Sequence, residues 1–166
     1  MKNYLTHSVT SMAIAIALSV TAHADTKPVQ GISDTVKSTS QVKIIEHVLK
    51  SQFDKPDAPL KVKPVTIEGH YAVAGWFQKE KGGRALLQFD QEKWSIVVCG
   101  GDGLRDPKVL IQTGMDSGTA NALAKKVQAS ESQLTKSELQ QLSLFEGMVK
   151  IEAGQHHGSG SEHKHH

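Results

Sequence analysis

Residues 62–99, VKPVTIEGHYAVAGWFQKEKGGRALLQFDQEKWSIVVC, decide the fold of this chain. The stretch holds four short runs of β-branched, aromatic and apolar residues, separated by polar or glycine-containing turns. Turns of three to five residues allow only hairpin connections, so neighbouring runs pair antiparallel. The predicted product is a four-stranded antiparallel meander with strands over residues 62–67, 71–78, 84–89 and 93–99.

The last of these strands indicates that both faces of the sheet are covered. Strict alternation places Trp94, Ile96 and Val98 on one face and Cys99 on the opposite face. Both faces are largely apolar, which is typical of a strand buried on two sides. We therefore expect helices to pack against the sheet.

An amphipathic helix precedes the sheet. Apolar residues recur at helical spacing from Val42 to Phe53. Pro56 ends this helix, because the residue before a proline is pushed out of the α region. Residues 25–40 are rich in Thr, Ser, Lys and Asp without periodicity, so they are predicted to be a flexible linker. The folded domain is therefore expected over residues 41–152.

Three further helices are predicted after the sheet. The first has Asp106 as N-cap and Pro107 as its first residue, and the second covers about residues 117–131. The third begins at the capping box TKSE of residues 135–138 and continues until Gly147. The fold class is thus α+β, an antiparallel four-stranded meander packed with an N-terminal helix and about three C-terminal helices. The residues expected to face inward on the second of these helices are Ala120, Leu123, Ala124 and Val127.

Residues 1–24 have the features of a secretory signal peptide. Lys2 supplies a positive start, residues 12–20 form an apolar stretch too short to span a bilayer, and small residues surround Ala24. An uncleaved membrane anchor is disfavoured, because polar residues follow directly from Asp25. We therefore expect a periplasmic protein that is cleaved before Asp25 and does not span the membrane after cleavage.

Composition narrows the classes of function. Cleavage would leave 142 residues, which suits one domain with tails. The remaining 18 Lys and Arg against 17 Asp and Glu give a net charge of +1, which argues against nucleic acid or an anionic membrane surface as partner. Neither G-x-S-x-G nor H-E-x-x-H is present, so no enzyme activity is expected.

Cys99 is the only cysteine of the chain, so no disulfide can form within it. Burial in the core is the favoured interpretation, ahead of binding a soft metal or linking two chains. Cys99 also ends a predicted strand at a glycine-rich segment, residues 100–103, where backbone amides can favour the thiolate. It is therefore kept as a candidate functional thiol.

The glycine-rich segment itself is predicted to be a structural turn. It lacks the full G-x-G-x-x-G pattern of a phosphate cradle, because the position three residues after Gly103 is Asp106, whose charge would repel phosphate. Arg84, at the start of the third predicted strand, is expected to form a structural ion pair with Asp102 or Glu68 rather than an anion site.

A histidine cluster ends the chain. Five of its nine histidines lie within the last eleven residues. Imidazole is mostly neutral at neutral pH and is a good ligand for Cu(II), Ni(II) or Zn(II). Residues 153–166 are otherwise polar, so a disordered, accessible tail is predicted, and its interrupted pattern favours a native metal-binding tail over a purification tag. The histidines are His156, His157, His163, His165 and His166.

Several separated motifs carry a family resemblance. They are FDKPDAPL over residues 53–60, EGHYAVAGW over 68–76, GGRALL over 82–87 and WSIVVCGGDGLR over 94–105. In this order they resemble the copper uptake system-associated proteins, small exported bacterial proteins that are mostly known by their association with periplasmic copper uptake genes and that often end in a His-rich tail. The resemblance implies a periplasmic role in copper supply or tolerance, with Cys99 and the tail histidines as the positions of interest.

The candidate copper ligands divide by oxidation state. The tail histidines suit Cu(II), whereas the Cys99 thiolate suits Cu(I). Met115 and Met148 are the other soft donors of the expected mature chain, and core or surface roles are more typical for both. His47 and His70 are expected to be solvent-facing helix and turn residues rather than ligands.

Two classes of function remain open. In the first, the protein is a copper-handling accessory protein whose tail gathers copper and whose domain meets a membrane copper transporter or another periplasmic copper protein. In the second, it is a non-metal periplasmic interaction domain, an inhibitor or assembly factor with an incidental tail. The second class would use a sheet surface that carries Tyr71, Trp76 and Phe77.

Overall fold

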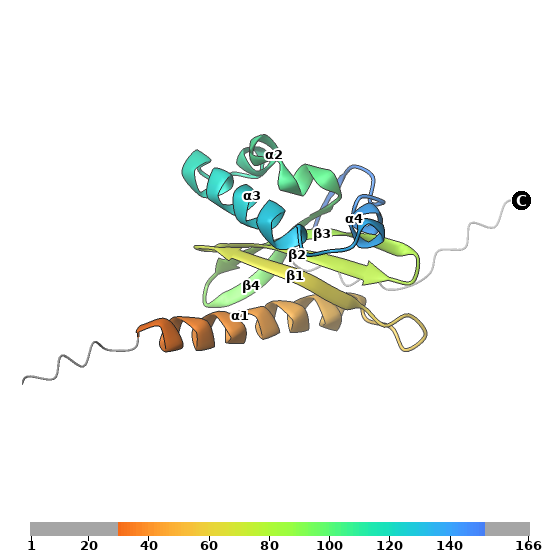
Figure 1. Cartoon of the computed structure of the whole chain (residues 1–166), viewed down its shortest axis with the longest axis horizontal. Coiled ribbons are helices and arrows are strands. Elements are labelled where there is room, and N and C mark those ends of the chain that lie inside the picture. Colours follow the sequence, from red (N-terminus) through yellow and green to blue (C-terminus); the bar gives the residue numbers. More distant parts are fainter. Residues whose placement is uncertain (1–29, 152–166) are drawn as a thin grey trace, which may run out of the picture.

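The computed structural model describes residues 30–151, with side chains from residue 37 onward. Figure 1 shows three layers, in which α1 covers one face of a sheet and the other helices cover the opposite face. Within residues 30–151, no helix is long and apolar enough to cross a membrane. The elements in chain order are α1 (Gln30–Phe53), β1 (Lys61–Glu68), β2 (Tyr71–Gln78), β3 (Lys81–Asp90), β4 (Lys93–Gly100), the 3₁₀ helix η1 (Asp102–Arg105), α2 (Pro107–Gln112), α3 (Ser117–Glu131), α4 (Lys136–Leu142) and β5 (Met148–Lys150).

The sheet is an antiparallel meander in the order β1-β2-β3-β4-β5. Its first four strands coincide with the predicted runs to within three residues, so the α+β class and the antiparallel pairing are confirmed. The predicted number of strands was wrong, because β5 adds a fifth strand through the pairing of Cys99 with Val149. A strand of three exposed residues has no detectable periodicity, so only its pairing with β4 reveals it.

The helix boundaries differ from prediction at both ends of the domain. Helix α1 begins at Gln30, well before Val42, so residues 30–40 are helical where a linker was expected. The apolar stripe on which the prediction relied begins only where α1 meets the sheet, around buried Ile45. Helix α4 has the predicted capping box but ends at Leu142 rather than at Gly147.

The two middle helices match their predicted starts. The Asp106 carboxylate accepts a hydrogen bond from the Lys108 amide at the start of α2, and the Asp116 side chain caps α3 in the same way. All four residues expected to face inward on α3 are buried. Local capping chemistry therefore places these helices correctly without any tertiary information.

The sheet separates two cores. The α1-side core lies between the sheet and α1, whereas the α3-side core lies between the sheet and η1, α2 and α3. Buried members of the α1-side core are Ile45, Leu49, Leu60, Val62, Ala72, Ala74, Ala85, Leu87, Trp94, Ile96 and Cys99. Buried members of the α3-side core are Val73, Leu86, Val98, Leu104, Leu110, Met115, Ala120, Leu123, Ala124 and Val127.

An irregularity in β4 decides on which side Cys99 lies. Leu86 pairs with Val98 whereas Leu87 pairs with Ile96, so the register shifts and Val97 is left between the two pairs. Such an extra residue reverses the alternation that follows it. Cys99 consequently packs in the α1-side core together with Ile96, and Val98 packs in the opposite core. The face predicted from strict alternation was therefore wrong for Val98 and Cys99.

Candidate functional site

The predicted tail, residues 153–166, and its five histidines lie outside the described residues, as do the predicted signal peptide and the first part of the predicted linker. The chain that leads to the tail is anchored to the sheet. Ile151 donates its backbone N–H to the Val97 carbonyl at 2.9 Å, directly after β5. Ile151, the last described residue, is thus held beside β4, which is the strand that carries Cys99.

Cys99 is a buried thiol, with 7% of its surface exposed. Burial raises the pKa of this thiol from about 9 to about 11, because the charged thiolate loses its hydration in the core. The favoured expectation of burial is therefore confirmed. The expectation that loop amides favour the thiolate is contradicted, since desolvation is the cause that decides the direction of the pKa shift.

The soft donors do not converge around Cys99. Met115 is buried in the α3-side core, on the other side of the sheet. Met148 pairs with Gly100, one position away from the pairing of Cys99 with Val149, so its side chain lies on the opposite face of the sheet from Cys99. Its Sδ atom would lie 3.9 Å from a Cβ placed on Gly103. No set of three soft ligands is thereby formed at Cys99 within residues 30–151.

The histidines of the domain are also separate from Cys99. His47 is an exposed residue of α1, and His70 stacks on Phe89 with ring centroids 6.1 Å apart, in the turn between β1 and β2. Both positions agree with the expected solvent-facing roles. Within residues 37–151, whose side chains the structure describes, no three His, Cys, Asp or Glu side chains form a group that could hold a metal ion.

Cys99 instead lines an apolar cavity of about 250 Å³. The walls come from the end of α1, the segment before β1, strands β2, β4 and β5, and the loop after α4. Three of the lining residues, Phe145, Val149 and Ile151, belong to the last stretch of chain before the predicted tail. The complete lining is Phe53, Leu60, Trp76, Gln78, Cys99, Phe145, Val149 and Ile151.

Glycines in β3 allow the aromatic walls of this cavity to form. Gly83 pairs with Trp76 across the sheet, and a Cβ on Gly83 would lie 2.8 Å from the Trp76 ring and 2.9 Å from the Cβ of Phe145. The two rings meet edge to face, with centroids 6.0 Å apart. Gly83 thus allows the Trp76 and Phe145 side chains to approach the backbone of β3 closely. The cavity is lined by residues from six segments of the chain, so no pattern in the sequence could have predicted it.

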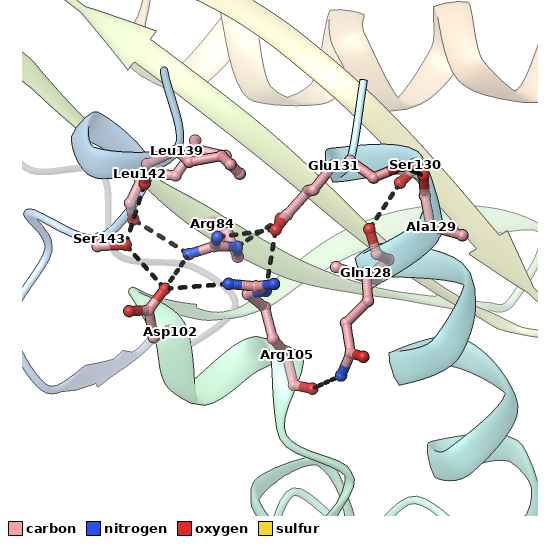
Figure 2. A network of polar contacts seen from close by, with 12 residues as sticks. Arg84, Asp102, Arg105, Gln128, Ala129, Ser130, Glu131, Leu139, Leu142 and Ser143 are labelled. Atoms are coloured by element: carbon pink, nitrogen blue, oxygen red, sulfur yellow. Dashed lines mark hydrogen bonds and ion pairs between the residues drawn. The ribbon is translucent and has the colours of Figure 1, made fainter. Parts of the chain in front are cut away.

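The opposite side of the sheet carries a buried charge network, drawn in Figure 2. The guanidinium of Arg84 is fully buried and donates two hydrogen bonds to the Glu131 carboxylate, at 2.6 and 2.9 Å. Its Nη1 donates to the Asp102 carboxylate at 3.1 Å and to the Leu142 carbonyl at 3.2 Å, where α4 ends. One side chain of β3 therefore joins η1, α3 and α4.

Arg105 completes the network from the side of η1. Its Nε lies 3.0 Å from the second oxygen of Glu131, at an angle that makes the contact an ion pair and not a hydrogen bond. The Ser143 hydroxyl donates to Asp102 at 2.8 Å. Two arginines thus face two carboxylates, and the charge is balanced within the network. The arrangement serves to hold segments together, and beside it lies a wide, largely open groove between η1 and α4.

The sequence prediction found part of this network. The ion pair of Arg84 with Asp102 is confirmed, whereas Glu68 pairs with Lys126 instead. Glu131, the closest partner of Arg84, was missed. A signal was present, because Glu131 continues the inward stripe of α3 one turn beyond Val127, and a carboxylate at such a position requires a buried cation.

Of the aromatic residues proposed as an interaction surface, one is buried and two are half-buried. Phe77 is buried, Tyr71 packs against the α3-side core and Trp76 against the α1-side core. Helices on both faces of the sheet are the reason (Figure 1). The large apolar residues that are exposed between the end of α4 and the end of β5 are Leu144, Met148 and Val149.

Comparison with known proteins found no matching family model, no matching curated protein and no matching solved structure. The resemblance to the copper uptake system-associated proteins therefore stays a prediction based on the motifs of this sequence.

Proposed function

We propose that this protein is a periplasmic copper-handling accessory protein that supports a copper uptake or tolerance system. One observation carries the proposal, the five histidines within the last eleven residues. Neutral imidazoles at this density are ligands for Cu(II) at neutral pH. The folded domain recognises a membrane copper transporter or a periplasmic copper protein, and the tail delivers or receives the ion.

The arrangement of the domain supports the tail as the main copper-binding part. The described side chains of residues 37–151 contain no group of three His, Cys, Asp or Glu metal ligands, and Cys99, Met115 and Met148 occupy three different environments. Ile151 is anchored to β4, so the tail starts from a defined point on the domain. The fifteen residues after Ile151, which include the predicted tail, reach at most about 54 Å from that point, at roughly 3.6 Å per residue.

Cys99 is a subsidiary Cu(I) position in this proposal. Because the pKa of its thiol is raised to about 11, binding of Cu(I) to the thiolate must displace a proton at neutral pH. Cu(I) affinity at Cys99 should therefore increase with pH up to about 11. A buried thiol without neighbouring soft donors supplies a single ligand, so it predicts a weaker Cu(I) site than a cluster of several soft donors would form.

Copper titration of the form that starts at Asp25 tests the proposal. Three variants separate the sites: one that ends at Gly154, one in which the five tail histidines become asparagine, and Cys99→Ser. We expect Cu(II) binding, measured by calorimetry, to disappear in the first two and to persist in Cys99→Ser. The asparagine variant keeps the tail length, so it separates the imidazoles from the tail itself. Cu(II) binding that persists in the asparagine variant would contradict the proposal.

A second class, a protein-interaction domain with an incidental tail, is favoured by a different observation. Leu144, Met148 and Val149 are 59%, 45% and 50% exposed and come from one short segment. Met148 and Val149 lie on opposite faces of edge strand β5, and an edge strand with exposed apolar side chains is a place where another chain can pair. Deletion of the residues after Gly154 distinguishes the classes, because only the copper role predicts that the deletion weakens a copper phenotype.

A further inference from the structure

The cavity beside Cys99 is a separate feature from the copper ligands of the tail. Its volume of about 250 Å³ lies at the edge of the α1-side core, where Leu60 and Cys99 are buried and the other lining residues are half-buried or exposed. A guest of matching shape would remove these apolar walls from water and gain van der Waals contacts with them. Val149 is half exposed at its rim, on edge strand β5, which provides a way in from solvent.

The chemistry of the lining selects the charge of a guest. Of the eight lining residues, six are aromatic or aliphatic, and the two others are Gln78 and Cys99. No Lys, Arg, His, Asp or Glu belongs to the lining, so a charged guest would lose its hydration without a counter-charge. The site is therefore built for a neutral molecule.

Gln78 supplies one directed polar contact. Its amide nitrogen is held by two hydrogen bonds of 2.8 Å, to the carbonyls of Phe53 and Ala58. These bonds fix the orientation of the side chain and use its donor group. What Gln78 can offer a guest is its carbonyl oxygen, an acceptor for one N–H or O–H group. Phe53, Trp76 and Phe145 supply ring surfaces around that position.

We propose that this cavity is a binding site for one small, neutral, predominantly apolar molecule, an aromatic or short-chain compound with a single hydrogen-bond donor directed at Gln78. The size follows from the volume. A cavity of roughly 150 Å³ takes up one benzene ring, so about 250 Å³ accommodates about ten non-hydrogen atoms. Because Val149 and Ile151 form one wall, an occupied site also stabilises β5, from which the tail continues.

Indole is a suitable probe, because it is neutral, has nine non-hydrogen atoms as roughly required by the volume, and carries one N–H donor. Indole-5-carboxylate is its charged counterpart. The protein that starts at Asp25 is titrated with each compound by calorimetry in the presence of EDTA, so the result is independent of the copper role. We expect one site for indole and no binding of the carboxylate.

Alkylation of Cys99 by iodoacetamide reports occupancy at the cavity itself, since Cys99 is the only cysteine. At an indole concentration ten times its dissociation constant, the rate of alkylation should fall about tenfold by mass action. Chemical shifts of the Trp76 indole and of the β5 amides in NMR spectra provide a second readout, which does not need a reactive thiol. Equal effects of indole and indole-5-carboxylate would overturn the proposal, as would no effect of indole on either readout.

A matched pair of variants locates the site. Val149→Trp adds a ring at the rim of the cavity, whereas Met148→Trp adds the same ring one residue away on the opposite face of β5. Both positions are about half exposed, so both variants should fold. We expect Val149→Trp to abolish indole binding and Met148→Trp to retain it. Equal indole affinity in the two folded variants would show that indole binds elsewhere and would overturn the proposal.

Discussion

The two sides of the sheet bury different kinds of side chain. On the α1 side, a single long helix covers apolar and aromatic residues, and a cavity of about 250 Å³ remains between them. On the other side, four short segments meet around Arg84, whose charge is paired with Glu131 and Asp102 (Figure 2). The α1 side contains an apolar hollow without charged lining residues, whereas the opposite side contains a buried charge network beside a wide, open groove.

Directed polar contacts hold one side of the sheet together, and undirected apolar contacts hold the other. A buried guanidinium needs several acceptors in fixed positions, so it joins β3, η1, α3 and α4 into one unit. Apolar contacts have no such directional requirement, so the α1 side can leave a volume unfilled and still fold. We therefore expect a substitution on the network side to lower the free energy of unfolding strongly when it leaves a buried charge unpaired, and little otherwise. On the α1 side, the loss should grow with the volume of side chain that is removed.

The largest effect is expected for Arg84→Met. The change leaves Glu131 buried without its main counter-charge, and removal of one partner of a buried pair costs about 3–5 kcal/mol. Urea denaturation measures the loss in the free energy of unfolding. The double variant Arg84→Met/Glu131→Met removes both charges and should recover a substantial part of it.

Asp102→Asn is the matched control for this prediction, because it removes the other carboxylate on Arg84, which is mostly exposed. An exposed pair contributes about 0–1 kcal/mol, so this variant should be nearly as stable as the wild type. A small loss in Arg84→Met, or a double variant no more stable than the single one, would show that the network is not what holds this side together.

The next effect concerns the α1-side core. Leu49 is fully buried against the sheet, so Leu49→Ala should lower the free energy of unfolding by about 3 kcal/mol, within the usual range for a buried leucine. Ile44, on the same helix, is 46% exposed, and Ile44→Ala should cost about 0.5 kcal/mol or less. Similar losses in the two variants would mean that α1 does not pack on the sheet through the Ile45–Leu49 face.

A smaller loss is expected for Gly82→Ala. A Cβ at this position of β3 would lie 2.6 Å from the Gln141 carbonyl oxygen, so α4 must move away from the sheet. Overpacking of this kind costs about 1–3 kcal/mol. Thermal unfolding measures the effect, and hydrogen exchange in α4 should increase with it. Unchanged stability and exchange would contradict the close approach of α4 to β3.

The smallest effect belongs to the exposed pair at the start of α4. Hydrogen bonds from Lys63 and from the Thr135 amide lower the pKa of Glu138 from 4.5 to about 2. A depressed pKa in the folded state contributes stability above pH 4.5, and that contribution is lost as the pH falls towards 2. The wild type and Glu138→Gln should therefore differ in unfolding above pH 4.5 and converge near pH 2. A difference that stays constant over this range would contradict the assigned role of Glu138.

Much of the fold could be predicted because its signals are local. Strand alternation with short turns marked β1 to β4, and Asp106, Asp116 and Thr135 each cap a helix within a few residues. The start of α1 could not be predicted from an apolar stripe, because its first turns extend beyond the sheet and have no core to face (Figure 1). Strand β5 was missed because its three exposed residues show no alternation, and only their pairing with β4 identifies them as a strand.

Some features of the candidate sites could likewise be predicted from local sequence, and others depend on contacts between distant segments. Burial was the favoured expectation for Cys99, and Asp102 was one of the two partners expected for Arg84, from residue type and position alone. The side of the sheet on which Cys99 lies depends on the irregularity at Val97, which no alternation pattern reveals. The cavity depends on segments from Phe53 to Ile151 that are distant in the chain.

Patterns within one turn, one strand or one short segment were enough to predict the α+β class, the antiparallel meander, the caps of α2 and α4, the single cysteine and the histidine-rich end. The side of the sheet that holds Cys99, the neutralisation of Arg84 by Glu131 and the cavity beside β5 emerge only from the folded chain. These features arise where distant segments meet, and the free energy of such contacts depends on geometry that no local pattern encodes.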